Sequence, residues 1–257
     1  MISVENITVS IGSKPLLENV SVEFEYGKLN LIIGPNGAGK STLIKVISKQ
    51  LVPKTGTVCF GKSDLQSISH SNLSVIRAVL SQNIDLAFPL TVREVVMMGR
   101  YPHFTEKPGK KDEDAIEHAM KFFDVWEMAD RNYMSLSGGE KQRVHFARVL
   151  AQIWFPVPDN YRYLILDEPL TFLDVYYQYQ FMNKIRELLQ REDLVMVGVV
   201  HDLNLAARFA DQIVLLHQGK VVVAGEKEKV LTIENIKQVY QLEPKIHTSE
   251  NIMHLLF

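Results

Sequence analysis

The sequence of 257 residues has one cysteine, no long apolar run and no excess of charge of either sign. Cys59 alone cannot form an intrachain disulfide or a cysteine-rich zinc site, and its neighbours Val58 and Phe60 predict a strand with a buried thiol. The longest uncharged apolar run, residues 194–200, is far shorter than the roughly 20 residues of a membrane-spanning helix. The 28 basic and 30 acidic side chains argue against a protein that coats nucleic acid, because such proteins carry a basic excess.

The first ten residues lack the basic and apolar segments of a signal peptide. Apolar residues make up 46% of the chain and charged residues 23%, which is typical of a globular protein with a core. This composition excludes a disordered regulator and a disulfide-stapled miniprotein. We therefore expect a protein of a reducing compartment that works at a membrane only through a partner.

Short β-rich runs alternate with helical patterns, which predicts an α/β fold around a central sheet. The compact apolar runs typical of buried parallel strands are Leu29–Ile33, residues 163–166 and residues 194–200. Residues 213–216 and 221–224 predict a late hairpin. Its turn is expected at Gln218 and Gly219. The first 28 residues alternate in polarity around two turns and predict antiparallel strands.

Residues 83–160 predict a helical block inserted in this α/β core. Thr91 and Glu94 match a capping box, which predicts a helix through Met98 that ends at Gly99. Further helices are predicted over residues 112–125 and 234–242. The single domain is thereby divided into a core of residues 1–82 and 161–225, the helical block of residues 83–160, and a C-terminal extension of residues 226–257.

A glycine-rich loop follows the first buried strand and precedes an amphipathic run, which is the context that a phosphate loop requires. Its residues are Gly34, Pro35, Asn36, Gly37, Ala38, Gly39, Lys40, Ser41 and Thr42. Glycines let backbone N–H groups converge on phosphate oxygens, and the helix N-terminus adds its positive dipole end. We expect Lys40 to reach the β- and γ-phosphates and Ser41 to supply a hydroxyl ligand to Mg²⁺.

Two adjacent carboxylates end the strand predicted at residues 163–166. A strand covered on both faces has no structural use for Asp167 and Glu168 at its carboxyl end, where ligands bind in open α/β sheets. We expect Asp167 to orient the Mg²⁺ shell and Glu168 to polarise an attacking water as a general base. His201 ends another apolar strand, either as a structural residue or as a γ-phosphate sensor, and Asp202 after it predicts a helix cap.

Residues 136–143, LSGGEKQR, resemble the signature motif of ATP-binding cassette (ABC) proteins. A capping box of Ser137 and Glu140 predicts a helix whose apolar face continues as far as Trp154. In ABC proteins two subunits pair head to tail, and each signature closes on the ATP of the other subunit. The resemblance therefore implies that the opposite subunit's ATP is contacted by Leu136, Ser137, Gly138, Gly139 and Glu140.

The order of the motifs, which spans about 170 residues, extends the resemblance and implies further roles. Gln82 corresponds to the Q-loop residue that links Mg²⁺ and water to the helical block, Asp174 lies in the D-loop, and His201 is the switch histidine. The implied catalytic residues are Glu168, His201, Gln82 and Lys40. The implied metal ligands are Ser41, Gln82 and Asp167.

The family fold is a RecA-like P-loop NTPase core with an N-terminal antiparallel β subdomain and an inserted helical subdomain, and we expect it here. Its members usually stack an aromatic ring on adenine near residue 11. This chain has Ile11, which offers the base only an apolar contact. The implied cofactors are ATP and Mg²⁺.

Residues 87–92 and 99–103, AFPLTV and GRYPH, resemble importer ATPases for iron-siderophores, haem and cobalamin. The lengthened segment of residues 151–158 resembles the haem importers within that group. The resemblance implies the ATP-hydrolysing motor of an importer, with haem as cargo and a ferric siderophore or cobalamin as the alternatives. Haem ligation by His103, His118 or His145 is the less favoured interpretation, because a motor need not touch the cargo.

The expected partners are a second copy of the chain, an integral-membrane permease and, indirectly, a substrate-binding protein, but no nucleic acid. The expected location is the cytoplasmic face of the inner membrane, as a peripheral subunit. A non-transport ABC ATPase of DNA repair or of ribosomes is the main rival, but the chain has neither a long coiled-coil insertion nor a second cassette. A P-loop kinase does not explain the signature motif.

Overall fold

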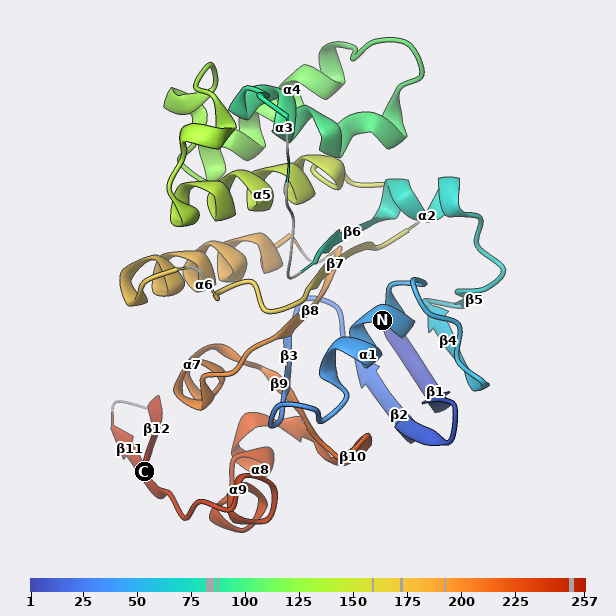
Figure 1. Ribbon diagram of the computed structural model, residues 1–257, viewed down its shortest axis with the longest axis vertical. Helices are drawn as coiled ribbons and strands as arrows, with labels where there is room; N and C mark the ends of the chain where they lie inside the picture. The colour runs from blue at the N-terminus through green and yellow to red at the C-terminus, as the bar shows by residue number, and fades with distance from the viewer. Residues whose placement is uncertain (82–85, 87, 159, 172, 192, 250–251) are drawn as a thin grey trace. The chain divides into compact units, whose positions relative to one another are not determined.

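Figure 1 shows the protein as a computed structural model, which describes residues 1–81, 86, 88–158, 160–171, 173–191, 193–249 and 252–257. The chain forms two compact units, each built from separated stretches of sequence. Unit 1 comprises Met1–Ile68, Leu166–Glu168 and Val195–Phe257. Unit 2 comprises Ser69–Ile165 and Pro169–Leu194. No helix in these described ranges is long and apolar enough to cross a membrane.

Unit 1 begins with an antiparallel sheet, which confirms the strands predicted for the first 28 residues. In sheet order the strands are β2 (Lys14–Phe24), β1 (Ile2–Ile11), β4 (Thr55–Phe60) and β5 (Ser63–Asp64). Cys59 lies in β4 as predicted, but the prediction of a buried thiol is wrong, because Cys59 is only half-buried. Side chains alternate along a strand, so the burial of Val58 and Phe60 turns Cys59 to the other face.

A second sheet gives unit 1 its buried parallel strands. Side by side lie β10 (Lys220–Glu226), β9 (Gln212–His217), β3 (Leu29–Ile33) and β8 (Leu194–Val199). β3 runs parallel to both β8 and β9, and all of its residues are buried. β9 and β10 form the predicted hairpin, whose turn residues Gln218 and Gly219 both have positive φ, as a type I′ turn requires. Because β3, β8 and β9 are parallel, the segments that follow them emerge at one edge of the sheet.

The C-terminal extension packs on the core of unit 1. The remaining elements of this unit are α1 (Lys40–Ile47), α7 (Leu203–Phe209), α8 (Lys227–Val230), α9 (Ile233–Tyr240), β11 (Lys245–Ser249) and β12 (Ile252–Leu256). The Asn204 side chain in α7 donates to the Leu255 carbonyl oxygen at 3.1 Å and accepts from the Leu255 N–H at 2.8 Å. These two bonds attach β12 to α7.

Unit 2 is mainly helical, and Figure 1 shows α3, α4 and α5 grouped together within it. Its helices are α2 (His70–Ile76), α3 (Val92–Met97), α4 (Lys110–Phe122), α5 (Gly138–Gln152) and α6 (Val175–Leu189). Short 3₁₀ helices are η1 (Met98–His103), η2 (Trp126–Met128) and η3 (Tyr133–Ser135). Two neighbouring strands are β6 (Arg77–Leu80) and β7 (Arg162–Leu166). The last residue of β7, Leu166, belongs to unit 1.

The capping box of Thr91 and Glu94 is confirmed at the start of α3, but the helical path does not end at Gly99. It continues as η1, because Gly99 packs against α5: a Cβ there would lie 2.0 Å from the Arg148 carbonyl oxygen. The buried guanidinium of Arg100 then donates to the Ala151 carbonyl oxygen at 2.7 Å. Tertiary packing therefore holds this segment in a tighter helix.

Both ends of α4 and the end of α5 differ from prediction, and α4 ends at Phe122 rather than at residue 125. α4 begins at Lys110 rather than at residue 112, because the Asp112 carboxylate accepts from the Gly109 N–H at 2.9 Å and caps the helix there. α5 ends at Gln152, so Trp154 lies beyond the helix on which it was predicted. The Arg162 guanidinium donates a hydrogen bond to the Trp154 carbonyl oxygen at 2.8 Å. This carbonyl is therefore paired outside the hydrogen-bond pattern of the helix.

Candidate functional site

The phosphate loop connects β3 to α1 in unit 1. All three of its glycines have positive φ: 150° at Gly34, 79° at Gly37 and 104° at Gly39. A Cβ on Gly34 would lie 2.2 Å from the Leu216 carbonyl oxygen, so only glycine fits there. Gly39 is the N-cap of α1 and no side chain caps this helix, which leaves its first N–H groups to an external acceptor.

Lys40 is held inside the loop that precedes it. Its Nζ donates to the carbonyl oxygens of Gly34 at 2.8 Å and Pro35 at 3.0 Å. Burial lowers the pKa of Lys40, while the carboxylates of Glu168 and Asp167 act in the opposite direction. The ammonium group is thus placed in the concave side of the loop, beside two carboxylates.

Ser41 and Asp167 bring two oxygen ligands together. The Ser41 hydroxyl donates to Asp167 Oδ1 at 3.3 Å. Burial, followed by the neighbouring Glu168 carboxylate, raises the pKa of Asp167, while the Ser41 hydrogen bond opposes the shift. A buried carboxylate beside a hydroxyl suits Mg²⁺, which takes one or two protein oxygens and completes its shell with phosphate and water. Within the described ranges no cluster of three or more His, Cys, Asp or Glu side chains forms a metal site.

Glu168 and His201 face each other after the ends of β7 and β8. The distance between Glu168 Oε1 and His201 Nε2 is 2.7 Å, with the Glu168 side chain 14% exposed and the His201 side chain 45% exposed. Glu168 has a φ of 51°, an uncommon conformation for a residue other than glycine. Asp202 caps α7, as predicted, by accepting from the backbone N–H groups of Asn204 and Leu205. The pair combines a proton acceptor with an imidazole at the solvent boundary.

A cavity of about 970 Å³ opens over the phosphate loop in unit 1. Glu168 and residues of the loop from Asn36 to Thr42 line one part of it. The rest of its wall comes from residues 14–18 of β2, residues 217–222 at the β9–β10 turn, and Gln238 of α9. Sequence reasoning predicted the turn but assigned no role to it or to Gln238, because neither matches a phosphate-binding pattern.

One residue expected at the site lies away from the cavity, and the position of another is not described. Ile11 ends β1 with 73% of its surface exposed and does not line the cavity. Gln82 lies outside the described residues, so its assignments to Mg²⁺ and water stay predictions.

The signature segment lies in unit 2, at the start of α5. The predicted capping box is confirmed: Ser137 Oγ accepts from the Glu140 N–H at 3.3 Å, and Glu140 Oε2 accepts from the Ser137 N–H at 2.8 Å. In the part of the chain that the structure describes, no residue beyond the helix itself and its chain neighbours lies within 4 Å of a Cβ built on Gly138, and Leu173 alone approaches that of Gly139, at 3.9 Å. Leu136, which precedes the cap, is 6% exposed. The two glycines are therefore sterically open at a helix N-terminus.

Asp174 is the N-cap of α6, where its side chain accepts from the Tyr177 N–H at 3.1 Å. The segment before it is tied to the signature helix, because Gln142 of α5 donates to the Pro169 carbonyl oxygen at 2.7 Å. These bonds connect the residues after Glu168 to α5 within unit 2.

The three histidines considered as haem ligands all contact other residues of unit 2. His145 is buried, lies 2.7 Å from the Tyr133 hydroxyl, and has its pKa lowered to about 3 by burial. The His118 ring stacks on Trp154 with centroids 5.5 Å apart, and His103 Nε2 lies 2.7 Å from a carbonyl oxygen at the end of α5. These contacts support structural packing.

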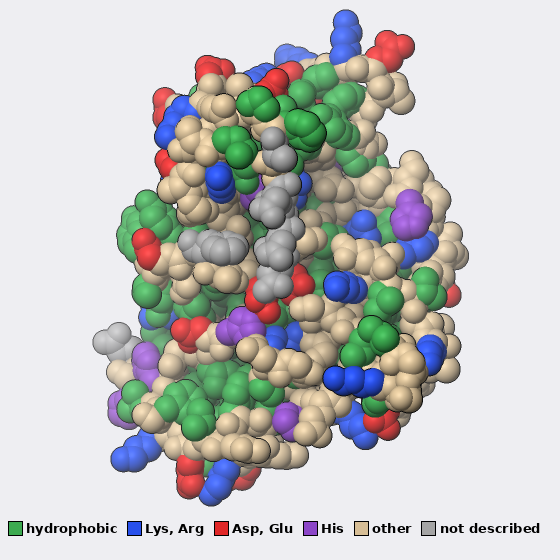
Figure 2. All heavy atoms as spheres, in the orientation of Figure 1, with side chains coloured by type: hydrophobic (Ala, Val, Ile, Leu, Met, Phe, Trp, Pro, Cys, Tyr) green, Lys and Arg blue, Asp and Glu red, His purple; other side chains and the backbone are tan. Residues whose placement is uncertain are grey.

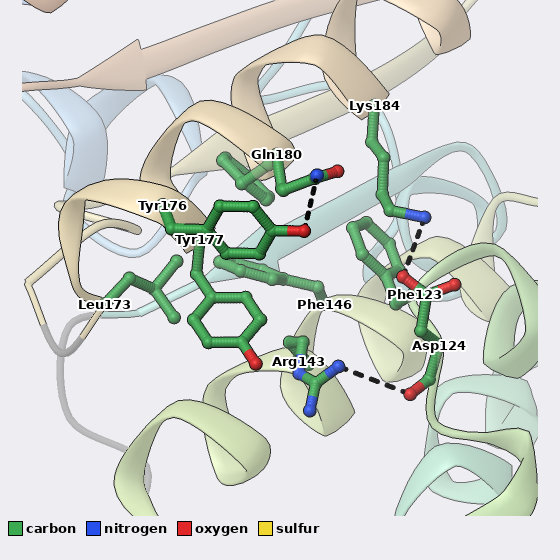
Figure 3. A pocket seen from close by; sticks show the side chains of 10 residues that line it. Phe123, Asp124, Arg143, Phe146, Leu173, Tyr176, Tyr177, Gln180 and Lys184 are labelled. Atoms are coloured by element: carbon green, nitrogen blue, oxygen red, sulfur yellow. Dashed lines mark hydrogen bonds and ion pairs between the residues drawn. The ribbon is translucent and has the colours of Figure 1, made fainter.

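A second, smaller cavity of about 220 Å³ lies in unit 2, and half of its lining residues are aromatic residues of α5, of α6 and of the segment that follows α4 (Figure 3). Its charged groups contact other residues that line it: Lys184 Nζ lies 3.1 Å from Asp124, and the Arg143 guanidinium lies over the Tyr177 ring, 5.1 Å from its centre. On the face drawn in Figure 2, basic and acidic side chains are interspersed rather than segregated. The phosphate-loop cavity is the better candidate for a phosphate ligand, because Lys40 and the N-terminus of α1, which no side chain caps, lie beside it.

Comparison with known proteins gives a family match over residues 17–171, to the ABC transporter model. The hemin import ATP-binding protein HmuV of Escherichia coli O157:H7 is 40% identical, covering 93% of this chain and 92% of the relative. HmuV of Gloeobacter violaceus is 43% identical, covering 95% of this chain and 88% of the relative. HmuV of Shewanella denitrificans is 37% identical, covering 100% of both chains.

Solved structures share the fold. An inward-facing metal-chelate type ABC transporter aligns with a TM-score of 0.83 at 24% identity, covering 99% of this chain and 96% of that chain. A bacterial ABC transporter cassette solved as a dimer aligns with a TM-score of 0.75 at 26% identity, covering 88% and 99%. An ATP-binding cassette in its ADP conformation aligns with a TM-score of 0.79 at 25% identity, covering 94% of this chain and 98% of that chain. These likenesses confirm the predicted α/β P-loop fold.

Proposed function

Because the chain belongs to the ABC transporter family, we propose that it is the ATP-hydrolysing motor subunit of an importer whose cargo is haem. One observation carries the catalytic part of the proposal: Lys40, the Ser41–Asp167 pair and the Glu168–His201 pair converge around one phosphate loop in unit 1. A fold that merely bound a nucleotide would not need the last pair.

ATP binds with its triphosphate along the loop and its γ-phosphate near Glu168. The Glu168 carboxylate accepts a proton from water as the water oxygen bonds to the γ-phosphorus. The bond from the γ-phosphorus to the β–γ bridging oxygen breaks, and ADP and inorganic phosphate are released. His201, 2.7 Å from Glu168, orients that carboxylate and contacts the γ-phosphate. Lys40 transfers its hydrogen bonds from the loop carbonyls to the β- and γ-phosphates.

Mg²⁺, when bound, neutralises charge on the β- and γ-phosphate oxygens. Ser41 and Asp167 would hold it, and their 3.3 Å contact supports this assignment. Gln82 is the third proposed ligand.

The chain acts as a head-to-tail homodimer, in which residues 136–140 close on the ATP of the opposite subunit and Asp174 lies in the D-loop. The sterically open glycines at the start of α5 support this role, since an uncovered helix N-terminus attracts phosphate. A bacterial cassette of this fold is described as dimeric. ATP binding closes the dimer, and hydrolysis removes the γ-phosphate contacts and reopens it.

The direct membrane partner is an integral-membrane permease, contacted by the helical part at residues 83–160, and the substrate-binding protein is reached through it. The core is residues 1–82 and 161–225, and residues 226–257 are its extension. The subunit lies peripherally on the cytoplasmic face of the inner membrane.

Haem is the proposed cargo because three relatives named for hemin import match nearly the whole chain at 37–43% identity. A deletion strain is expected to fail to grow with haem as sole iron source while growing on inorganic iron. The gene restores growth, whereas the Glu168→Gln gene does not. If the strain failed on a ferric siderophore but grew normally on haem, the cargo would be a siderophore rather than haem. Growth on every iron source would contradict a role in iron import.

A further inference from the structure

The C-terminal hairpin places two histidines directly opposite each other. Its strands β11 and β12 pair antiparallel, and their register aligns His247 with His254. We propose that these two imidazoles bind one divalent transition-metal ion, such as Zn²⁺, between them. Neither histidine lines the phosphate-loop cavity, and the inference does not depend on the proposed function.

The register brings the two imidazoles within reach of one ion. Residues directly opposite in an antiparallel pair have Cβ atoms about 4.5–5.5 Å apart on the same face of the sheet. Imidazole nitrogen is a ligand that suits Zn²⁺, Cu²⁺ and Ni²⁺. The short spacing excludes a haem iron between the two rings, because its two axial ligands approach from opposite faces of the porphyrin. A bare metal ion is therefore the ligand that fits this pair.

Packing turns the histidines away from the rest of unit 1. Figure 1 shows the hairpin beside α7. Leu255 is buried there, and the Asn204 side chain accepts from its N–H at 2.8 Å and donates to its carbonyl oxygen at 3.1 Å. Because neighbouring side chains of a strand point to opposite faces, His254 lies on the outer face with His247. His247 is exposed and His254 is half-buried, so an ion from solvent reaches both.

Both imidazoles are available as ligands. Within the residues that the structure describes, neither ring makes a hydrogen bond, an ion pair or a ring contact. Zn²⁺ takes four ligands, so two water molecules complete its shell. Lys245 is the neighbouring cation on this face, two residues before His247 and about 7 Å away at the spacing of a strand. Its charge and the two water ligands make us expect weaker binding than at a structural zinc site with four protein ligands.

Titration calorimetry of the full chain with Zn²⁺, without nucleotide, measures this site. Excess Mg²⁺ is present throughout, because it competes for oxygen ligands at the nucleotide site but not for imidazole. His247→Ala and His254→Ala are each expected to lower the Zn²⁺ affinity at least about tenfold, since loss even of a group that supports a metal ligand costs about 10–100-fold. The control His70→Ala removes an exposed histidine of α2 and should leave the affinity unchanged.

An exchange of two neighbouring residues tests the geometry of the site. The double variant His247→Thr, Thr248→His keeps the composition of the hairpin but moves one imidazole to its other face, because side chains alternate along β11. It should lose as much Zn²⁺ affinity as His247→Ala. Circular dichroism and thermal unfolding verify that each variant is folded.

The inference would be overturned if the original chain bound no Zn²⁺, or if both alanine variants bound it as tightly as the original chain. An equal loss in His70→Ala would also overturn it, because the affinity would then not depend on the hairpin. Retained affinity in the exchange variant would exclude an ion held between opposed side chains. Since no measurement uses ATP, a chain that bound Zn²⁺ at the hairpin but did not hydrolyse ATP would refute the proposed function and leave the metal site standing.

Discussion

Replacing Glu168 by Gln is expected to lower the rate of ATP hydrolysis by at least about a hundredfold while ATP still binds. The amide keeps the size of the side chain and its place opposite His201, but it cannot accept the proton of the attacking water. Removal of a positioned general base typically costs two to four orders of magnitude. The phosphate contacts of Lys40 and Ser41 are untouched, so the ATP-bound dimer should accumulate. Steady-state phosphate release and gel filtration with ATP measure both effects.

The matched control is Glu228→Gln, which removes an exposed carboxylate from α8 in the same unit. It should hydrolyse ATP at the original rate. Turnover of Glu168→Gln close to the original would remove Glu168 from the role of general base.

Replacing Lys40 by Ala is expected to weaken ATP binding by about one to two orders of magnitude. Its ammonium is positioned by the Gly34 and Pro35 carbonyl oxygens, 2.8 and 3.0 Å away. Hydrogen bonds to a charged group contribute about 1.5–3 kcal/mol each, which corresponds to a loss of this size. Titration calorimetry with ATP measures the affinity, and thermal unfolding verifies that the loop variant remains folded.

Lys54→Ala is the control, because Lys54 is an exposed lysine of unit 1 that does not line the cavity. Its ATP affinity should equal that of the original chain. If Lys40→Ala bound ATP equally well, the phosphate contacts assigned to Lys40 would be incorrect.

The parts of the site that sequence predicts best are those fixed by local chemistry. The phosphate loop needs glycine at Gly34, Gly37 and Gly39, and each has the positive φ that favours glycine. The capping box at Ser137 is predictable because its hydrogen bonds join residues three apart. Glu168 and His201 could each be placed near the phosphate loop because both follow buried strands, which end at one edge in an α/β sheet.

The features that sequence does not predict arise from contacts between distant segments. η1 continues past Gly99 because that glycine lies against Arg148 of α5. His217 is placed at the phosphate loop by the pairing of β9 with β3 and by the bond from Gly219 to Ala38. Neither segment carries a local pattern that marks such a role.

Haem uptake into vesicles that contain the chain with its permease tests the central claim most directly. The account predicts that haem uptake requires ATP bound between the two subunits. Uptake should stop when the Glu168→Gln variant replaces the original chain and proceed with the Glu228→Gln control. Haem accumulation at the same rate without ATP, or with Glu168→Gln in place of the original chain, would contradict it.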